Sequence, residues 1–225
     1  MALFENSHKI NTLFNMKYIE NAPKKCKVKA GIFIRRGAMY LFSIVAREDF
    51  ISIVMDAYQV GMEDSEVQEG SYFREITPDQ SFYIFEGPAD FGELGWNIAA
   101  QMSCEGADLK DIALSILQKW QESGQEAEME AVIGGMSATG EIQYHLISNE
   151  NITSYFPKAG ESLYYANDLS FKVSPMEELS RTLMMRGMST VSQAQSAQFD
   201  LFDKFAGSRP GVSSFAQCLV IEKAE

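Results

Sequence analysis

Cysteine and histidine are scarce in this sequence, and neither occurs at the spacing that a metal site needs. The three cysteines, Cys26, Cys104 and Cys218, lie far apart, and the two histidines are His8 and His145. Structural zinc sites use closely spaced pairs of these ligands, so we expect no metal and no other cofactor. An odd number of scattered cysteines is typical of a reducing compartment. The sequence therefore predicts a cytoplasmic protein.

Positively charged residues are also few. Nineteen lysines and arginines stand against thirty-one aspartates and glutamates, which gives a formal net charge of -12 at pH 7. Such an excess of negative charge repels phosphate backbones and anionic lipid headgroups. The basic residues between Lys24 and Lys29, and the pair Arg35 and Arg36, are interpreted as solvated loop and strand-edge charges. We therefore expect no nucleic acid partner.

Long apolar runs are missing as well. No segment is long enough to cross a bilayer, and Met1–Lys9 has no apolar core of the kind that a secretory signal carries, so we expect no membrane partner. Hydrophobic residues nevertheless make up 46% of the 225 residues, which is enough for the core of one large domain. We expect an N-terminal extension over 1–25, with a short helix that Pro23 ends, and a single domain over 26–225.

Apolar segments bounded by turn residues predict most of the strands. The segment 38–46 is expected to pair with 28–34 as a hairpin around a turn at 35–37. The run 50–55 barely alternates, which favours a strand buried on both faces. Further strands are predicted over 71–76, 81–85, 129–135, 141–147, 152–156 and 215–221.

Helical periodicity separates these groups of strands. Leu94, Ile98 and Met102 recur at helical spacing, and Asp108 is expected to cap a second helix. A third helix is predicted to begin at Pro175, and the segment 199–202 is also expected to be helical. The order is strands, two helices, strands, helices and a final strand. It predicts an α+β fold, a four-layer αββα sandwich with two mainly antiparallel sheets.

Several segments, taken in order, resemble proteasome subunits. Residues 13–25 are similar to the N-terminal segment of the α-type subunits, and 27–32 with Gly37 to the first strand and turn of both the α- and β-type subunits. The other similar segments are 75–90, where a strand ends at Gly87 before Ala89 and Asp90, then 133–145 and 159–166. This resemblance implies the Ntn-hydrolase fold, in which catalytic members use an N-terminal threonine as both nucleophile and base.

The position of that threonine falls near Cys26 or Lys27 here, and the family's aspartate falls at Ser43 or Asp56. The resemblance therefore implies a non-catalytic, ring-forming structural subunit, a pseudoenzyme that assembles with copies of itself or with related subunits. Self-association is expected to bury apolar side chains of the helix faces. The expected interface residues are Leu183, Met184 and Phe202.

Two alternatives stay open. In the first, removal of the residues before Cys26 creates an N-terminal cysteine nucleophile that hydrolyses amide or peptide bonds, with Arg74 as its basic neighbour and the Gly87 N–H as oxyanion donor. Neighbouring lysines favour the thiolate of Cys26. Cys26 packed at the start of a strand, and Gly87 as a turn glycine, are the structural interpretations of the same residues. In the second alternative, the sandwich is an unrelated α+β binding module.

Overall fold

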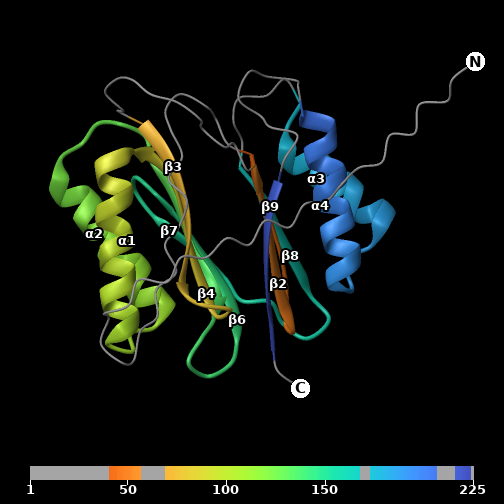
Figure 1. Cartoon of the computed structure of the whole chain (residues 1–225), viewed down its shortest axis with the longest axis horizontal. Coiled ribbons are helices and arrows are strands. Elements are labelled where there is room, and N and C mark those ends of the chain that lie inside the picture. Colours follow the sequence, from red (N-terminus) through yellow and green to blue (C-terminus); the bar gives the residue numbers. More distant parts are fainter. Residues whose placement is uncertain (1–40, 57–68, 168–172, 207–215, 224–225) are drawn as a thin grey trace, which may run out of the picture.

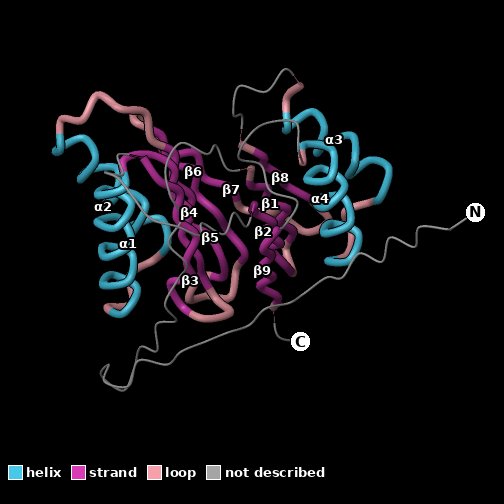
Figure 2. Tube along the Cα trace, turned by 45° about the horizontal axis from the view of Figure 1, so that its top comes forward, coloured by secondary structure: helices cyan, strands magenta, loops and turns pink. Residues whose placement is uncertain are grey.

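A computed structural model describes residues 41–56, 69–167, 173–206 and 216–223. Two antiparallel sheets lie face to face between two pairs of helices (Figure 1), and a second view shows the same four layers (Figure 2). The strands are β1 (Phe42–Arg47), β2 (Phe50–Asp56), β3 (Glu69–Thr77), β4 (Ser81–Pro88), β5 (Glu130–Met136), β6 (Ile142–Ser148), β7 (Ile152–Tyr155), β8 (Ser162–Ala166) and β9 (Ala216–Glu222). The helices are α1 (Ala89–Cys104), α2 (Leu109–Ser123), α3 (Pro175–Arg186) and α4 (Val191–Phe205). The predicted αββα sandwich is confirmed.

The two sheets differ in how the chain builds them. The five-stranded sheet has the order β3-β4-β5-β6-β7, so its neighbours follow one another along the sequence. The four-stranded sheet has the order β8-β1-β2-β9, so the first and last described strands, β1 and β9, lie on either side of β2. Helices α1 and α2 cover the five-stranded sheet, and α3 and α4 cover the four-stranded sheet (Figure 1).

Strand alternation divides the core into three layers. Between the sheets lie side chains such as Ile44, Ile53 and Ile84. The opposite faces of the strands pack against the helices, with Tyr83 and Phe85 under α1 and α2, and Val45 and Val54 under α3 and α4. Burial of apolar area contributes roughly 25 cal/mol per Å², so these three layers supply the main driving force for folding.

The first predicted hairpin is wrong in its pairing. The segment 28–34 lies outside the described residues, but the second arm is observed as β1. One edge of β1 pairs with β2 and the other with β8, so its hairpin partner is 50–56. The strand β8 was not predicted, because most of its side chains are only half-buried and give no clear alternation. The other predicted strands and helices in the described ranges are present. Their ends are shifted by a few residues, except that α4 begins at Val191, well before the predicted helical segment 199–202.

Local side chains fix the helix ends. Ser174 accepts a hydrogen bond from the Glu177 N–H, and Pro175 occupies the first helical position, as predicted. Asp108 stands at the predicted N-cap of α2, but its side chain makes no capping bond. Instead Oδ1 of Asp108 accepts a hydrogen bond from Nε2 of Gln143 at 3.1 Å. The carboxylate therefore ties α2 to strand β6.

Candidate functional site

Arg74, the predicted basic neighbour of the nucleophile, is buried on the helix side of β3. Its Nη1 and Nη2 atoms donate to the two carboxylate oxygens of Glu93 on α1, at 3.4 and 3.0 Å. The guanidinium also lies 5.2 Å from the ring centroid of Trp96. Only 8% of Arg74 is exposed. Its charge is therefore directed at α1, away from the space between the sheets.

Gly87, the predicted oxyanion donor, lies near the end of β4 with φ +147°. A Cβ atom at this position would approach Cζ of Phe85 to 2.9 Å and Cβ of Met129 to 3.1 Å. The close packing and the backbone angle both require glycine here. Cys26 lies outside the described residues.

The two positions predicted for the family's aspartate differ in their surroundings. Ser43 is fully buried and faces α4, where its Oγ accepts a hydrogen bond from Nε2 of Gln198 at 3.1 Å. Asp56 is the last residue of β2. Ser43 therefore belongs to the contact between β1 and α4, on the far side of the sheet from the inter-sheet core.

A polar group that was not predicted joins the two sheets where β4 ends and β1 begins. This inter-sheet polar group consists of Glu86, Glu130, Tyr165 and Asn167. Tyr165 donates from its hydroxyl to Oε1 of Glu130 at 2.8 Å. Asn167 donates from Nδ2 to Oε2 of Glu86 at 3.3 Å, and its Oδ1 accepts from the N–H of Phe42 at 2.8 Å. Each bond to a glutamate therefore connects one sheet with the other.

The electrostatics of this group follow from its position. Glu86 and Glu130 are direct partners across β4 and β5, so two carboxyl groups are placed side by side. Burial raises the pKa of Glu130, an effect that the Tyr165 hydrogen bond opposes. Burial and the Glu130 carboxylate raise the pKa of Tyr165. The phenol therefore keeps its proton and remains the donor to Glu130.

His145 lies on β6, fully buried on the helix side. Its Nδ1 is 2.9 Å from the Ser154 hydroxyl, and Nε2 is buried with no hydrogen-bond partner in the described part of the chain. The pKa of His145 is lowered to about 4, mainly by burial; Asp108 opposes this shift, and Lys110 contributes to it. The neutral imidazole therefore packs edge-on against Phe156 at a centroid distance of 5.7 Å.

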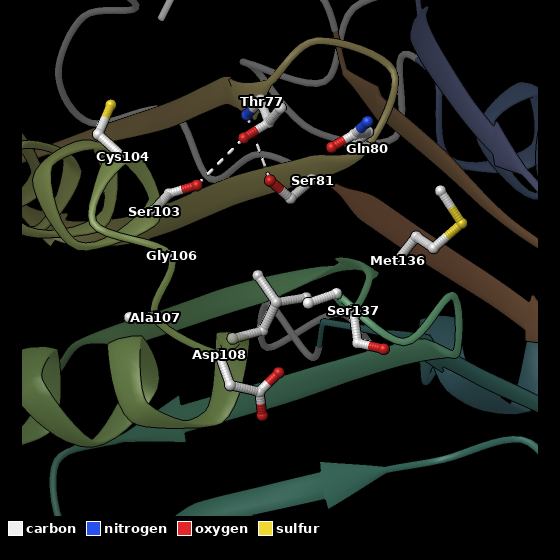
Figure 3. A pocket seen from close by; sticks show the side chains of 12 residues that line it. Thr77, Gln80, Ser81, Ser103, Cys104, Gly106, Ala107, Asp108, Met136 and Ser137 are labelled. Carbon is white, nitrogen blue, oxygen red and sulfur yellow. Dashed lines mark hydrogen bonds between the residues drawn. The ribbon is translucent and has the colours of Figure 1, made fainter. Parts of the chain in front are cut away.

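A hollow of about 410 Å³ lies at one end of the five-stranded sheet. Figure 3 shows hydroxyl side chains from the β3–β4 turn and the end of α1 meeting there. The Thr77 and Ser103 hydroxyls are 3.1 Å apart, and the Thr77 N–H donates to the Ser81 hydroxyl at 3.2 Å. These hydrogen bonds close the β3–β4 turn and join it to the end of α1.

A solved structure of another protein has a similar fold. Anbu (ancestral beta-subunit) from Yersinia bercovieri is similar to this chain, with a TM-score of 0.56 and 10% sequence identity over 82% of each chain. The chain has the fold of the proteasome-like Ntn proteins. Neither a family model nor a curated protein sequence matches it.

The described ranges contain neither a candidate metal site nor a candidate membrane-spanning helix. No three side chains among His, Cys, Asp and Glu in those ranges are arranged to hold a metal ion. Each described helix is too short or too polar to span a lipid bilayer.

The structure therefore places two of the predicted site residues, Gly87 and Arg74, in different surroundings. Gly87 lies next to Glu86 at the end of the sandwich where β1 begins, whereas Arg74 is turned toward α1. The inter-sheet polar group was missed because its members are far apart in the sequence. The only local signal was a glutamate at the end of one predicted strand and another at the start of the next, which meet when those strands pair.

Proposed function

We propose that this protein is a non-catalytic, ring-forming structural subunit of the proteasome-like type, which assembles with copies of itself or with related subunits. The similarity to Anbu, whose name describes it as an ancestral beta-subunit, supports a proteasome-like role. The non-catalytic part of the proposal rests mainly on Arg74. Both carboxylate oxygens of Glu93 engage its guanidinium, which also stacks near Trp96.

This arrangement does not suit a residue that assists a nucleophile between the sheets. Glu93 holds the Arg74 guanidinium in a two-point ion pair. Moving the guanidinium toward the space between the sheets would leave it buried without that partner. The inter-sheet polar group supports the same conclusion. Tyr165 and Asn167 use their donors on Glu130 and Glu86, so these side chains link the sheets at the end where Gly87 lies.

Assembly is supported by apolar side chains on helix α3. Met184 and Met185 are neighbours there, and they are 79% and 59% exposed. Large exposed apolar side chains, when they cluster, mark surfaces that other chains cover. Of the predicted interface residues, only Met184 is exposed. Leu183 and Phe202 are buried in the core under α3 and α4, which corrects the prediction for these two.

Two measurements on the purified protein test this proposal. Native mass spectrometry with negative-stain imaging is expected to give closed rings whose mass is a multiple of the 25.2 kDa chain. A stable monomer would contradict the ring and favour the unrelated binding module. Intact mass under denaturing conditions is expected to show no species beginning at Cys26. Detection of that species together with amide hydrolysis would establish the N-terminal nucleophile alternative instead.

A further inference from the structure

The hollow at one end of the five-stranded sheet is formed by three connections of the chain. The β3–β4 turn contributes Thr77, the end of α1 and the start of α2 contribute Ser103 and Asp108, and the β5–β6 turn contributes Ser137. Figure 3 shows Thr77 and Ser103 on one side of the hollow, with Asp108 and Ser137 on the other. Its volume of about 410 Å³ lies within the roughly 300–1,000 Å³ that is typical of small-molecule pockets. The hollow is therefore large enough to hold a small organic ligand.

Asp108 is the only charged residue among the described residues that line the hollow. Its Oδ1 atom accepts the hydrogen bond from Gln143, whereas its Oδ2 atom makes no hydrogen bond or ion pair with a described residue. The hydroxyl and amide side chains of the lining are neutral. Because an ionised carboxylate only accepts hydrogen bonds, it complements a ligand that donates them, most strongly a cation.

Further carboxylates stand next to the lining residues in all three connections. Asp79 lies in the β3–β4 turn, Glu105 directly after α1 and Glu141 in the β5–β6 turn, and all three are exposed. In the described ranges, none of these carboxylates and not Asp108 belongs to an ion pair. Lys110 is the only basic residue in these stretches of the sequence, and it does not line the hollow. Charges of one sign around a hollow focus its field, so this one attracts cations.

Apolar side chains complete the lining. Leu109 of α2 is buried and Met136 of β5 is partly buried, and the two small residues Ala107 and Ala138 lie beside the same space. Methylene groups of a ligand gain from contact with such side chains, while the charged ends of the ligand stay at the carboxylates. The lining therefore suits a molecule that joins positive charge to a short hydrocarbon chain.

We propose that this hollow binds a small aliphatic diamine or polyamine. One ammonium group donates to Oδ2 of Asp108, the hydrocarbon chain packs on Leu109 and Met136, and a second ammonium group meets the neighbouring carboxylates. An ammonium group carries three donors and no acceptor, which complements a carboxylate with an unused oxygen. Phosphate and carboxylate ligands are repelled by the same charges. The site involves neither α3 nor the proposed ring, so its test is independent of the assembly.

Isothermal titration calorimetry of the full-length protein at physiological ionic strength tests the site. Putrescine, a four-carbon diamine, is expected to bind with one ligand per chain, whereas the uncharged diol of the same length is expected not to bind. Magnesium chloride is the second comparison, because Mg²⁺ offers the same total charge without a hydrocarbon chain. Absence of putrescine binding would overturn the proposal. Equal affinity for Mg²⁺, with mutual displacement, would also overturn it, since the attraction would then be a diffuse effect of the net negative charge.

Asp108→Asn removes the charge from the hollow and keeps the local structure. Asparagine is a good N-cap residue, and its Oδ1 atom still accepts from Gln143. The variant is expected to weaken putrescine binding by about tenfold or more, the loss of a hydrogen bond to a charged group. Asp111→Asn is the matched control, since Asp111 is an exposed acid in the first turn of the same helix and does not line the hollow. Equal weakening by the two variants would contradict the role of Asp108.

Ala138→Trp separates the shape of the hollow from its charge. Ala138 lines the hollow from the exposed β5–β6 turn, so a larger side chain is tolerated by the fold and fills the space. Every carboxylate is kept in this variant, and putrescine binding is expected to be lost. Circular dichroism checks that each variant is folded. Unchanged affinity in the folded tryptophan variant would place the amine outside the hollow and overturn the proposal.

Discussion

Gln198 and Ser52 are joined by a 2.7 Å hydrogen bond between helix α4 and strand β2, and neither residue is exposed to solvent. Nε2 of Gln198 also donates to the backbone oxygen and the hydroxyl of Ser43 on β1, at 3.0 and 3.1 Å. One buried amide therefore connects α4 to two neighbouring strands. An apolar layer fixes the position of a helix loosely, whereas this set of directional bonds fixes its register on the sheet.

Replacement of Gln198 by leucine is expected to destabilise the protein by about 2–4 kcal/mol, because the polar groups of Ser43 and Ser52 would remain buried without their partner. Urea unfolding measures this loss. Gln195→Leu on the same helix is the control, since Gln195 is only half-buried and the change is expected to stay within about 0.5 kcal/mol. Adding Ser43→Ala and Ser52→Ala should recover part of the loss. Equal effects of both leucine variants would contradict this role.

Much of the fold follows from local sequence patterns. Apart from β8, the strands after residue 69 lie near their predicted positions, as do helices α1 to α3, and α4 contains the segment 199–202 that was predicted to be helical. Side-chain periodicity and residues such as Ser174 and Pro175 act within their own segments. The pairing of the strands was harder to predict from the sequence. The apolar segment 38–46 fits a partner on either side in the sequence, and only the assembled sheet shows that β1 pairs with β2 and β8.

The site was harder to predict than the fold. Glu130 and Tyr165 lie in different sheets, and no spacing in the sequence indicates that they meet. Arg74 was proposed as a site residue because a charged residue in a strand next to a family motif suggested chemistry. Whether such a residue faces the inter-sheet core or the helices depends on strand register, and one residue of shift exchanges the two faces.

Glu130→Gln is expected to change how stability depends on pH. Because burial raises the pKa of Glu130, the folded protein binds its proton more tightly than the unfolded chain. The stabilisation from this proton is complete below the unfolded pKa and is lost as the pH rises through the higher folded pKa. Glutamine has no charge to bury and still accepts the Tyr165 hydrogen bond. Chemical unfolding from pH 4 to 8 should therefore show the variant gaining stability relative to wild type as the pH rises.

Glu222→Gln is a suitable control for the pH series, since Glu222 is an exposed residue at the end of β9. The difference between this variant and wild type should be nearly constant from pH 4 to 8. If the Glu130 and Glu222 variants followed the same curve, the stability change could not be assigned to the buried carboxyl group.

His145 is expected to make the protein sensitive to acid. Its pKa falls from 6.5 to about 4 on folding, so the unfolded state binds the proton more readily. The stability contribution is complete above pH 6.5 and is lost as the pH falls toward 4, with a maximum of about 3 kcal/mol since each pKa unit corresponds to roughly 1.4 kcal/mol. His145→Gln should reduce this loss. NMR titration of the imidazole tests the cause directly, because a midpoint near 6.5 in the folded protein would contradict it.

Gly87→Ala tests the packing requirement at the end of β4. Alanine would adopt the unfavourable φ of +147° and would place its Cβ 2.9 Å from Phe85 and 3.1 Å from Met129. Strain and overpacking together are expected to cost about 2–4 kcal/mol.

Gly140→Ala is the matched control, because Gly140 also has a positive φ, +79°, but no atom lies within 4 Å of an added Cβ. Its cost should be about 1 kcal/mol, the backbone strain alone. Thermal and urea unfolding of both variants measure the difference. Equal losses would contradict the packing explanation and leave the positive φ as the reason for glycine at position 87.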